Sequence, residues 1–222
     1  PEETRTISID LTALAASYHD QGAAGGHSSA KWCFWGYKLG LVVTKSGIPI
    51  AFRLMKANWT EGTSSLPLIQ EAKQRLSEVG RLEGLEFLTA DKGYDAEKNY
   101  RETAKGCRSM MVCPGKKRQY KKRVKDPKVR KRALQLHPFR TQALKFYDTY
   151  EGQVVFRDRT GVERANSQLK GAIFGIDRFP PHVRGLRRVT AWCLGKLLHY
   201  ILGICVNRAN ARSDHSMRAF VA

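Results

Sequence analysis

Acidic residues are scarce in this sequence. Its 222 residues include 20 Asp and Glu but 39 Lys and Arg, which gives a formal net charge of +19 at pH 7. So large an excess of one sign is typical of proteins that bind a polyanion. Nucleic acid is the first candidate for that partner, and an anionic membrane surface is the second.

Paired cysteines are also lacking. The five cysteines are scattered, odd in number and without a C-x-x-C pair: Cys33, Cys107, Cys113, Cys193 and Cys205. This pattern argues against a disulfide framework and against a zinc site, and it fits a reducing compartment.

No apolar run is long enough to span a bilayer. The most apolar stretch, residues 192–206, has 15 residues and is interrupted by Lys196 and His199. A spanning helix needs about 20 consecutive apolar residues. We therefore predict a buried helix here and no membrane partner.

Three stretches of alternating apolar residues open the chain. Residues 5–10 form the first predicted strand, which ends near Asp10. Residues 31–44 and 48–56 alternate in the same way around a short turn, and this pattern predicts an antiparallel hairpin. A glycine-rich loop, residues 17–30, separates the first strand from the hairpin.

Helices and strands alternate after the hairpin. The apolar spacing predicts a helix over 64–79, a strand over 86–90 that delivers Asp91, a helix over 95–105 and a fifth strand over 109–113. Three antiparallel strands followed by helix, strand, helix and strand is the element order of the ribonuclease-H-like fold. We therefore predict an α/β protein with a mixed five-stranded sheet flanked by helices, in which the first and fourth strands are neighbours.

The rest of the chain divides into a basic connector and C-terminal helices. Eleven of the seventeen residues 116–132 are Lys or Arg. Such a run is either a solvated segment or one that follows phosphates. We assign residues 1–175 to one ribonuclease-H-like domain with a basic connector at 116–158, and residues 176–222 to a helical segment packed on it.

The stretch 155–171, VFRDRTGVERANSQLKG, carries the most specific pattern. Glu163 follows Arg159 by four residues and precedes Lys170 by seven, so a helix places all three along one stripe. A carboxylate between two phosphate-binding cations suits metal-dependent chemistry on a polyanion. The alternative is that Thr160-x-x-Glu163 is a capping box, in which Glu163 only caps the start of the helix.

Asp10 and Asp91 supply two further carboxylates. Each closes a predicted strand, and the predicted topology brings the two together with Glu163 from the later helix. In-line cleavage of a phosphodiester needs an activated nucleophile and a stabilised leaving oxygen, which two Mg²⁺ or Mn²⁺ ions supply. These hard cations take carboxylate oxygens as ligands. The alternatives are that Asp91 starts a turn and that Asp10 caps a loop, with Asp20 as the substitute ligand.

These motifs resemble those of the DDE-type transposases of bacterial insertion sequences. The matching stretches are TADKGYD at 89–95, ISIDLTAL at 7–14 and GVERANSQLKG at 161–171. Arg159, Glu163 and Lys170 resemble, in residue type and spacing, the Arg, Glu and Lys of the Y-x2-R-x3-E-x6-K signature of the DDE_Tnp_1-like group. The resemblance covers roughly residues 5–175.

The resemblance implies a transposase that hydrolyses the ends of its mobile element and joins the freed 3′-hydroxyls to target DNA. It implies that Asp10, Asp91 and Glu163 are catalytic and bind two Mg²⁺ or Mn²⁺ ions. It also implies that Arg159 and Lys170 hold DNA phosphates. The implied partner is double-stranded DNA, bound by a homodimer, in the cytoplasm and nucleoid of a prokaryote.

The basic connector adds candidate DNA contacts, namely Lys116, Lys117, Arg118, Lys121, Lys122 and Arg123. Two features depart from the family. Phe156 stands where the signature has tyrosine, so packing is retained while a hydroxyl contact is lost. The interval between the fifth predicted strand and Glu163, about fifty residues, is short for the large β insertion that some members carry. Two alternatives stay open: another ribonuclease-H-like nuclease, or a non-catalytic DNA-binding protein derived from a transposase.

Overall fold

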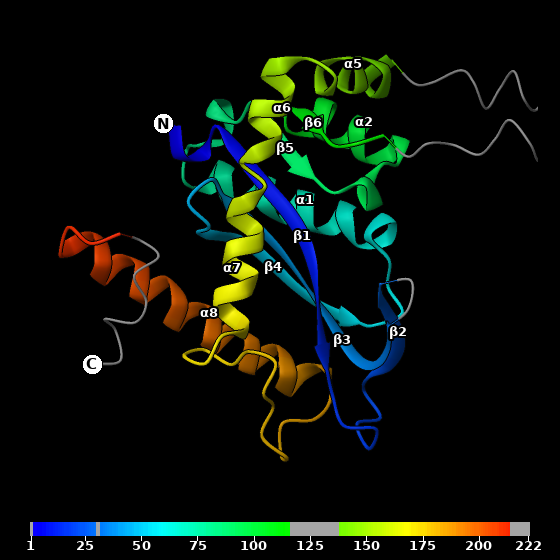
Figure 1. Ribbon diagram of the computed structural model, residues 1–222, viewed down its shortest axis with the longest axis vertical. Helices are drawn as coiled ribbons and strands as arrows, with labels where there is room; N and C mark the ends of the chain where they lie inside the picture. Colours follow the sequence, from blue (N-terminus) through cyan, green and yellow to red (C-terminus); the bar gives the residue numbers. More distant parts are fainter. Residues whose placement is uncertain (1, 30–31, 116–137, 214–222) are drawn as a thin grey trace, which may run out of the picture.

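The computed structural model describes residues 2–29, 32–115 and 138–213 of the chain (Figure 1). Within these residues a central sheet is built from six strands: β1 (Thr6–Ala15), β2 (Ala24–Ser29), β3 (Trp32–Thr44), β4 (Pro49–Lys56), β5 (Phe87–Ala90) and β6 (Met110–Val112). The helices are α1 (Glu61–Glu78), α2 (Glu97–Gly106), α5 (Pro138–Tyr147), α6 (Tyr150–Arg157), α7 (Thr160–Lys170) and α8 (Leu186–Ala209). Short 3-10 turns are η1 (Glu2–Thr4), η2 (Leu82–Gly84) and η3 (Lys92–Tyr94).

The sheet is mixed. Its strand order is β2-β3-β1-β5-β6, and β4 also pairs with β3. β1 is antiparallel to β3 and parallel to β5, with Ile9 opposite Ala90. The first and fourth predicted strands are therefore neighbours, as expected, and the α/β class is confirmed with a fold consistent with the ribonuclease-H-like type.

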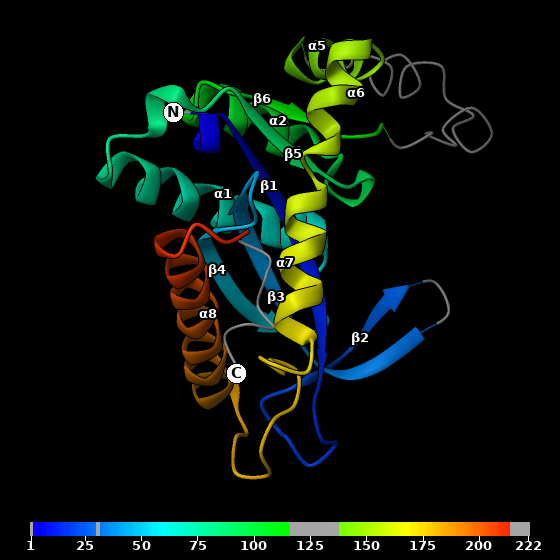
Figure 2. The ribbon, with the colours of Figure 1, turned by 60° about the vertical axis from the view of Figure 1, so that its left-hand side comes forward.

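Part of the expected glycine-rich loop is a strand. β2 pairs with the first residues of β3, and Figure 2 shows this hairpin projecting from the body of the molecule. The glycines serve close packing as well as turns. A Cβ on Gly26 would lie 2.2 Å from the carbonyl oxygen of Ala57, so only glycine fits there.

β1 is longer than the predicted strand. It continues past Asp10 to Ala15 because the residues beyond Asp10 remain paired with β3, with Asp10 opposite Leu41. Its parallel pairing with β5 extends only to Ile9. The prediction that Asp10 ends its strand is therefore wrong. Asp10 lies inside β1, directly after the last residue of β1 that pairs with β5.

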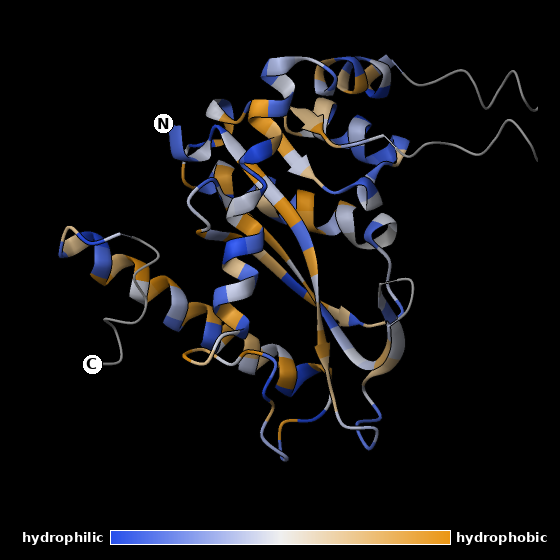
Figure 3. Cartoon of the chain, viewed as in Figure 1, coloured by the Kyte–Doolittle hydropathy of each residue, from blue (hydrophilic) through white to orange (hydrophobic). Residues whose placement is uncertain are grey.

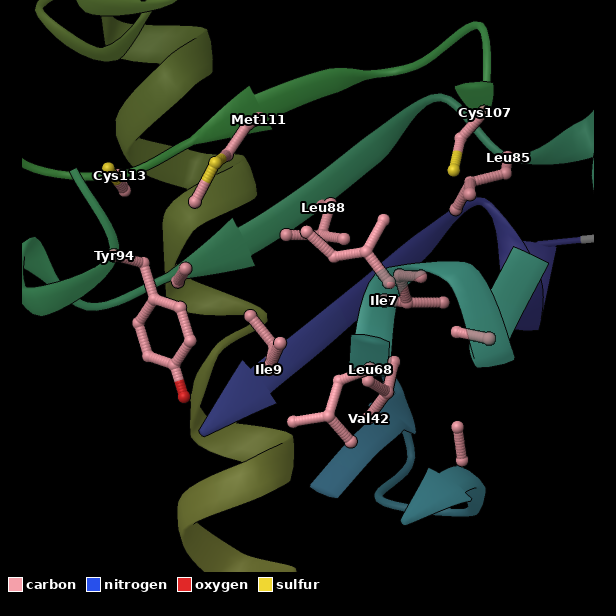
Figure 4. Packing of buried hydrophobic residues seen from close by; sticks show 14 of the residues in the cluster. Ile7, Ile9, Val42, Leu68, Leu85, Leu88, Tyr94, Cys107, Met111 and Cys113 are labelled. Carbon is pink, nitrogen blue, oxygen red and sulfur yellow. The ribbon is translucent and has the colours of Figure 1, made fainter. Parts of the chain in front are cut away.

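Two clusters of buried apolar residues pack on the sheet, and Figure 3 shows hydrophobic residues along the strands and on the helices around them. One cluster joins Ile7 and Ile9 of β1 to α1, α2 and α5, and Figure 4 shows its centre. The other cluster joins alternate residues of β3 to α7 and α8. Because strand residues alternate between faces, Ser8 and Asp10 point to the α7 face.

The helix α8 contains the apolar run 192–206, agrees with a long last helix expected over about 184–208, and is only half buried. Its inner side, including Val189, Cys193 and Tyr200, joins the second cluster. Its outer side exposes a ridge of Leu194, Leu198, Leu202 and Val206. By length and composition alone α8 could cross a membrane, a test that core helices of soluble proteins also pass.

Candidate active site

Asp10 lies at the centre of the candidate site, half-buried on β1 beneath α7. Its Oδ2 accepts a hydrogen bond from the Nδ2 of Asn166, 3.0 Å away and 156 residues later in the chain. On the same face, the Ser8 hydroxyl bonds to that of Thr89 on β5 at 2.7 Å. These contacts fix β1 against β5 and α7 around Asp10.

Asp91 follows β5 directly and is half-buried. Its carboxylate accepts a hydrogen bond from the backbone N–H of Lys92 at 2.7 Å, so it caps η3. The turn-starting role that we considered is therefore present. A carboxylate with one such bond keeps further lone pairs for a ligand.

Glu163 lies in the first turn of α7, and its side chain is about half exposed. Its Oε1 is 2.7 Å from the Nη1 of Arg159, which occupies the N-cap position of α7 and makes no side-chain capping bond. Thr160 is exposed inside the helix. The alternative of a Thr160–Glu163 capping box is therefore wrong.

In the sequence, Val162, Ala165, Leu169 and Ile173 recur at helical spacing and predict a stripe that anchors the helix. Val162, Ala165 and Leu169 are buried against the α7 face of the sheet. This packing leaves Glu163 at the surface of the site and puts Lys170, at the last turn, half-buried. Burial lowers the pKa of Lys170, and the charges of Asp177 and Asp10 oppose that change.

The electrostatics of Asp10 link the three carboxylates. Burial raises the pKa of Asp10 to about 6. The Arg159 guanidinium opposes the rise, while the charges of Asp91 and Glu163 add to it. Three acids from distant parts of the chain therefore act on one another, and a bound cation would relieve their repulsion.

Four buried polar atoms lack a hydrogen-bond partner among the described residues: Tyr94 Oη, Arg159 Nε, Asn166 Oδ1 and Asp177 Oδ1. Each belongs to a residue close to the acids or to Lys170. The Tyr94 hydroxyl points out of the apolar cluster in Figure 4, and its pKa is raised by burial and by the charges of Asp10, Glu61 and Asp91. Partnerless buried groups are rare in proteins and often mark a place where a ligand or water binds.

The chemistry of the donor set fits a hard divalent cation, because it consists of carboxylates and an amide oxygen. The described residues contain no group of three or more His, Cys, Asp or Glu already arranged to hold a metal ion. The Glu163 carboxylate pairs with Arg159. To join Asp10 and Asp91 at a metal, Glu163 would exchange that partner for the cation.

Two acids near the motifs have structural roles. Asp20, the substitute ligand, is buried and accepts hydrogen bonds from the Tyr37 hydroxyl and from the N–H groups of Gly22 and Gly185. Asp95 forms a buried bidentate pair with Arg140. Both oxygens of each carboxylate are therefore held by donors of the fold.

Two site residues were missed in the sequence. Asn166 lies three residues after Glu163, so helical periodicity places it on a neighbouring face of α7. Tyr94 closes the Asp-x-Gly-Tyr motif that begins at Asp91. Periodicity could have drawn attention to Asn166, but only the fold shows that both side chains are buried beside Asp10.

Two further sequence predictions stand apart from this cluster. Phe156 packs edge-on against Tyr147, with ring centroids 5.2 Å apart, so the position of the signature tyrosine is used for packing. The proposed DNA contacts of the basic connector lie outside the described residues: Lys116, Lys117, Arg118, Lys121, Lys122 and Arg123.

Comparison with known families agrees with these motifs. The family model described as "Transposase DDE domain" (DDE_Tnp_1) matches residues 1–202. A search of curated proteins and a search of solved structures each returned no match. Because the family model covers most of the chain, including Asp10, Asp91 and Glu163, this chain belongs to the transposase DDE domain family.

Proposed function

We propose that this chain is the catalytic domain of a DNA transposase that hydrolyses phosphodiesters at the ends of a mobile element and transfers the freed strand to target DNA. The observation that carries the proposal is the match of residues 1–202 to the transposase DDE domain family, and the hydrogen bond of Asn166 to Asp10, which joins the helix of Glu163 to β1, supports it. The net charge of +19 supports a polyanionic substrate.

In this proposal Asp10, Asp91 and Glu163 are the catalytic residues and hold two Mg²⁺ or Mn²⁺ ions. When bound, such ions activate a nucleophilic oxygen and stabilise the leaving oxygen of an in-line displacement. The half-buried position of Asp10 supports its role, because a carboxylate with a raised pKa gains most from a cation.

Arg159 and Lys170 bind DNA phosphates beside the acids. Arg159 pairs with Glu163 in the free protein. A phosphate, like a carboxylate, is a bidentate partner for a guanidinium, so a DNA phosphate would compete with Glu163 for Arg159 and release the Glu163 carboxylate. The basic residues between 116 and 132 extend the contact along the duplex.

We further infer a homodimer assembled on DNA, because two element ends must be handled together, acting in the cytoplasm and nucleoid of a prokaryote. Residues 1–175 form the catalytic domain in this proposal. Residues 176–222 form a helical segment packed on it, which the contact of α8 with the second apolar cluster supports.

The test is a cleavage and joining assay with the full chain. The substrate is a linear duplex that contains the DNA flanking its coding sequence, with a supercoiled plasmid as target, in Mg²⁺, Mn²⁺ or EDTA. We expect divalent-dependent cleavage and joined products. Cleavage without joining would favour a plain ribonuclease-H-like nuclease, and salt-sensitive binding without cleavage in either metal would favour a non-catalytic DNA-binding protein.

A further inference from the structure

Asn166 makes a contact that the fold alone does not require. Its side chain is buried on α7, and its Nδ2 donates to the Oδ2 of Asp10 at 3.0 Å. Its Oδ1 is also buried and has no hydrogen-bond partner among the described residues. One half of the amide is therefore used by Asp10, and the other half is left unsatisfied.

An asparagine in this position is unfavourable for folding. Asparagine is a weaker helix former than alanine or leucine. A buried oxygen without a partner loses its hydrogen bonds to water and gains none in exchange, which destabilises the fold. The neighbouring residues that anchor α7, Ala165 and Leu169, are apolar and buried, so an apolar residue would suit the packing at least as well.

The position of Asn166 links two of the three acids. It lies one turn after Glu163 on α7 and touches Asp10 on β1. Tyr94, buried in the η3 turn that Asp91 caps, also has a buried hydroxyl without a partner among the described residues, which is a second and independent observation of an unsatisfied polar group near the acids. An amide that donates to a carboxylate and keeps a free carbonyl oxygen is suited to that region.

We propose that Asn166 is a positioning residue of the active site, an inference that rests on the proposed function. Its Nδ2 fixes the orientation of the Asp10 carboxylate, and its Oδ1 accepts a hydrogen bond from a water of hydration of the divalent ion. A hydrogen bond to a carboxylate that binds a metal ion fixes the orientation of that carboxylate before the ion binds. Such supporting contacts increase the affinity for the metal.

The test measures Mn²⁺ binding to the full chain without DNA, by electron paramagnetic resonance of free Mn²⁺. Asn166→Leu removes the donor and the acceptor while keeping a branched side chain. We expect its Mn²⁺ affinity to fall by roughly tenfold to a hundredfold. DNA affinity in EDTA should match that of the unsubstituted chain, and saturating Mn²⁺ should restore most of the cleavage rate. If Asn166 only stabilised the fold, saturating Mn²⁺ would not restore the cleavage rate of the Asn166→Leu variant.

A second variant and a control complete the test. Asn166→Ser is too short to reach Asp10 and should show the same loss, so it decides the matter if Asn166→Leu fails to fold. Ser167→Ala, at the exposed next position of α7, should bind Mn²⁺ as the unsubstituted chain does.

Two outcomes would overturn the inference. If the folded Asn166 variants bind Mn²⁺ with an affinity within twofold of that of the unsubstituted chain, the positioning role of Asn166 is overturned and the proposed function is not. Absence of both Mn²⁺ binding and cleavage in the unsubstituted chain would overturn the proposed function as well.

Discussion

Arg159 and Glu163 form an ion pair across one helical turn, with Nη1 and Oε1 2.7 Å apart. In the proposed function, Glu163 binds a metal ion and Arg159 binds a DNA phosphate. Each partner is therefore satisfied in the free protein by the other. Binding of DNA together with a divalent ion would replace this one pair by two contacts of higher charge.

Replacing Arg159 by Gln should weaken DNA binding in a salt-dependent way. A phosphate contact by one cation contributes about one to the slope of log affinity against log salt concentration. Fluorescence anisotropy in EDTA at several salt concentrations measures that slope. Arg81→Gln, at an exposed position between α1 and η2, serves as the control. Equal slopes for the Arg159 variant and the unsubstituted chain would remove Arg159 from the DNA contact.

Asp10→Asn should stabilise the metal-free protein at neutral pH. Burial raises the pKa of Asp10 from its ordinary value of 3.8 to about 6, so the folded chain binds more protons than the unfolded chain between these values. Stability therefore falls as pH rises from about 4 to about 6 and stays lower above that. The uncharged amide removes a penalty of about 1–2 kcal/mol at pH 7.5 and almost none at pH 4.

Urea unfolding in EDTA at pH 4 and pH 7.5 measures this effect. Asp148→Asn, at an exposed position after α5, is the control for the loss of one negative charge. An Asp10→Asn variant no more stable than the unsubstituted chain at pH 7.5 would show that Asp10 bears no such penalty.

Arg140→Leu should destabilise the fold strongly. Arg140 and Asp95 form a buried pair with Nε–Oδ1 and Nη2–Oδ2 distances of 2.7 and 2.6 Å, which ties α5 to the start of α2. Losing one partner leaves a buried charge and costs about 3–5 kcal/mol. Arg75→Ala, which breaks an exposed pair with Glu78, should cost less than about 1 kcal/mol in the same urea unfolding assay. Similar losses in both variants would contradict the difference in burial.

Two tyrosines on the same side of the sheet should respond in opposite ways to loss of the hydroxyl. The Tyr94 hydroxyl has no partner, so Tyr94→Phe should leave the metal-free protein as stable or up to about 1 kcal/mol more stable. The Tyr100 hydroxyl donates to Asp95 at 3.1 Å and contacts the Cys113 sulfur, so Tyr100→Phe should cost about 1–2 kcal/mol. Thermal unfolding measures both, and equal destabilisation would mean that Tyr94 has a partner in solution.

Local patterns predicted most of the sheet and the anchoring of α7. Alternation placed Tyr37, Leu39 and Leu41 on one buried face of β3 because a strand repeats every two residues. The same rule missed β2, because its glycines are typical of a loop and their close packing is visible only in three dimensions. No helix was predicted in the basic connector 116–158, yet its described part contains α5 and α6.

Contacts between distant residues could not be read from the sequence. Asp95 begins the helix predicted over 95–105, a position where an acid commonly caps. In the structure Ala96 occupies the N-cap of α2, and Asp95 binds Arg140 instead. Asp20 likewise ties the loop after β1 to the start of α8 through Gly185. The sequence drew attention to the three acids because each lies in a short motif. It did not draw attention to Asn166, because the hydrogen bond of Asn166 is to a residue 156 positions away.

The most direct test of the proposed activity is Mg²⁺-dependent cleavage by Glu163→Gln, compared with the unsubstituted chain at equal DNA occupancy. The substitution keeps the shape of the side chain and removes the charge that a metal ion needs. We expect cleavage to fall by at least about a thousandfold, equivalent to about 4 kcal/mol of transition-state stabilisation, with DNA binding in EDTA retained. Undiminished Mg²⁺-dependent cleavage by the variant would contradict the assignment of Glu163 to the active site.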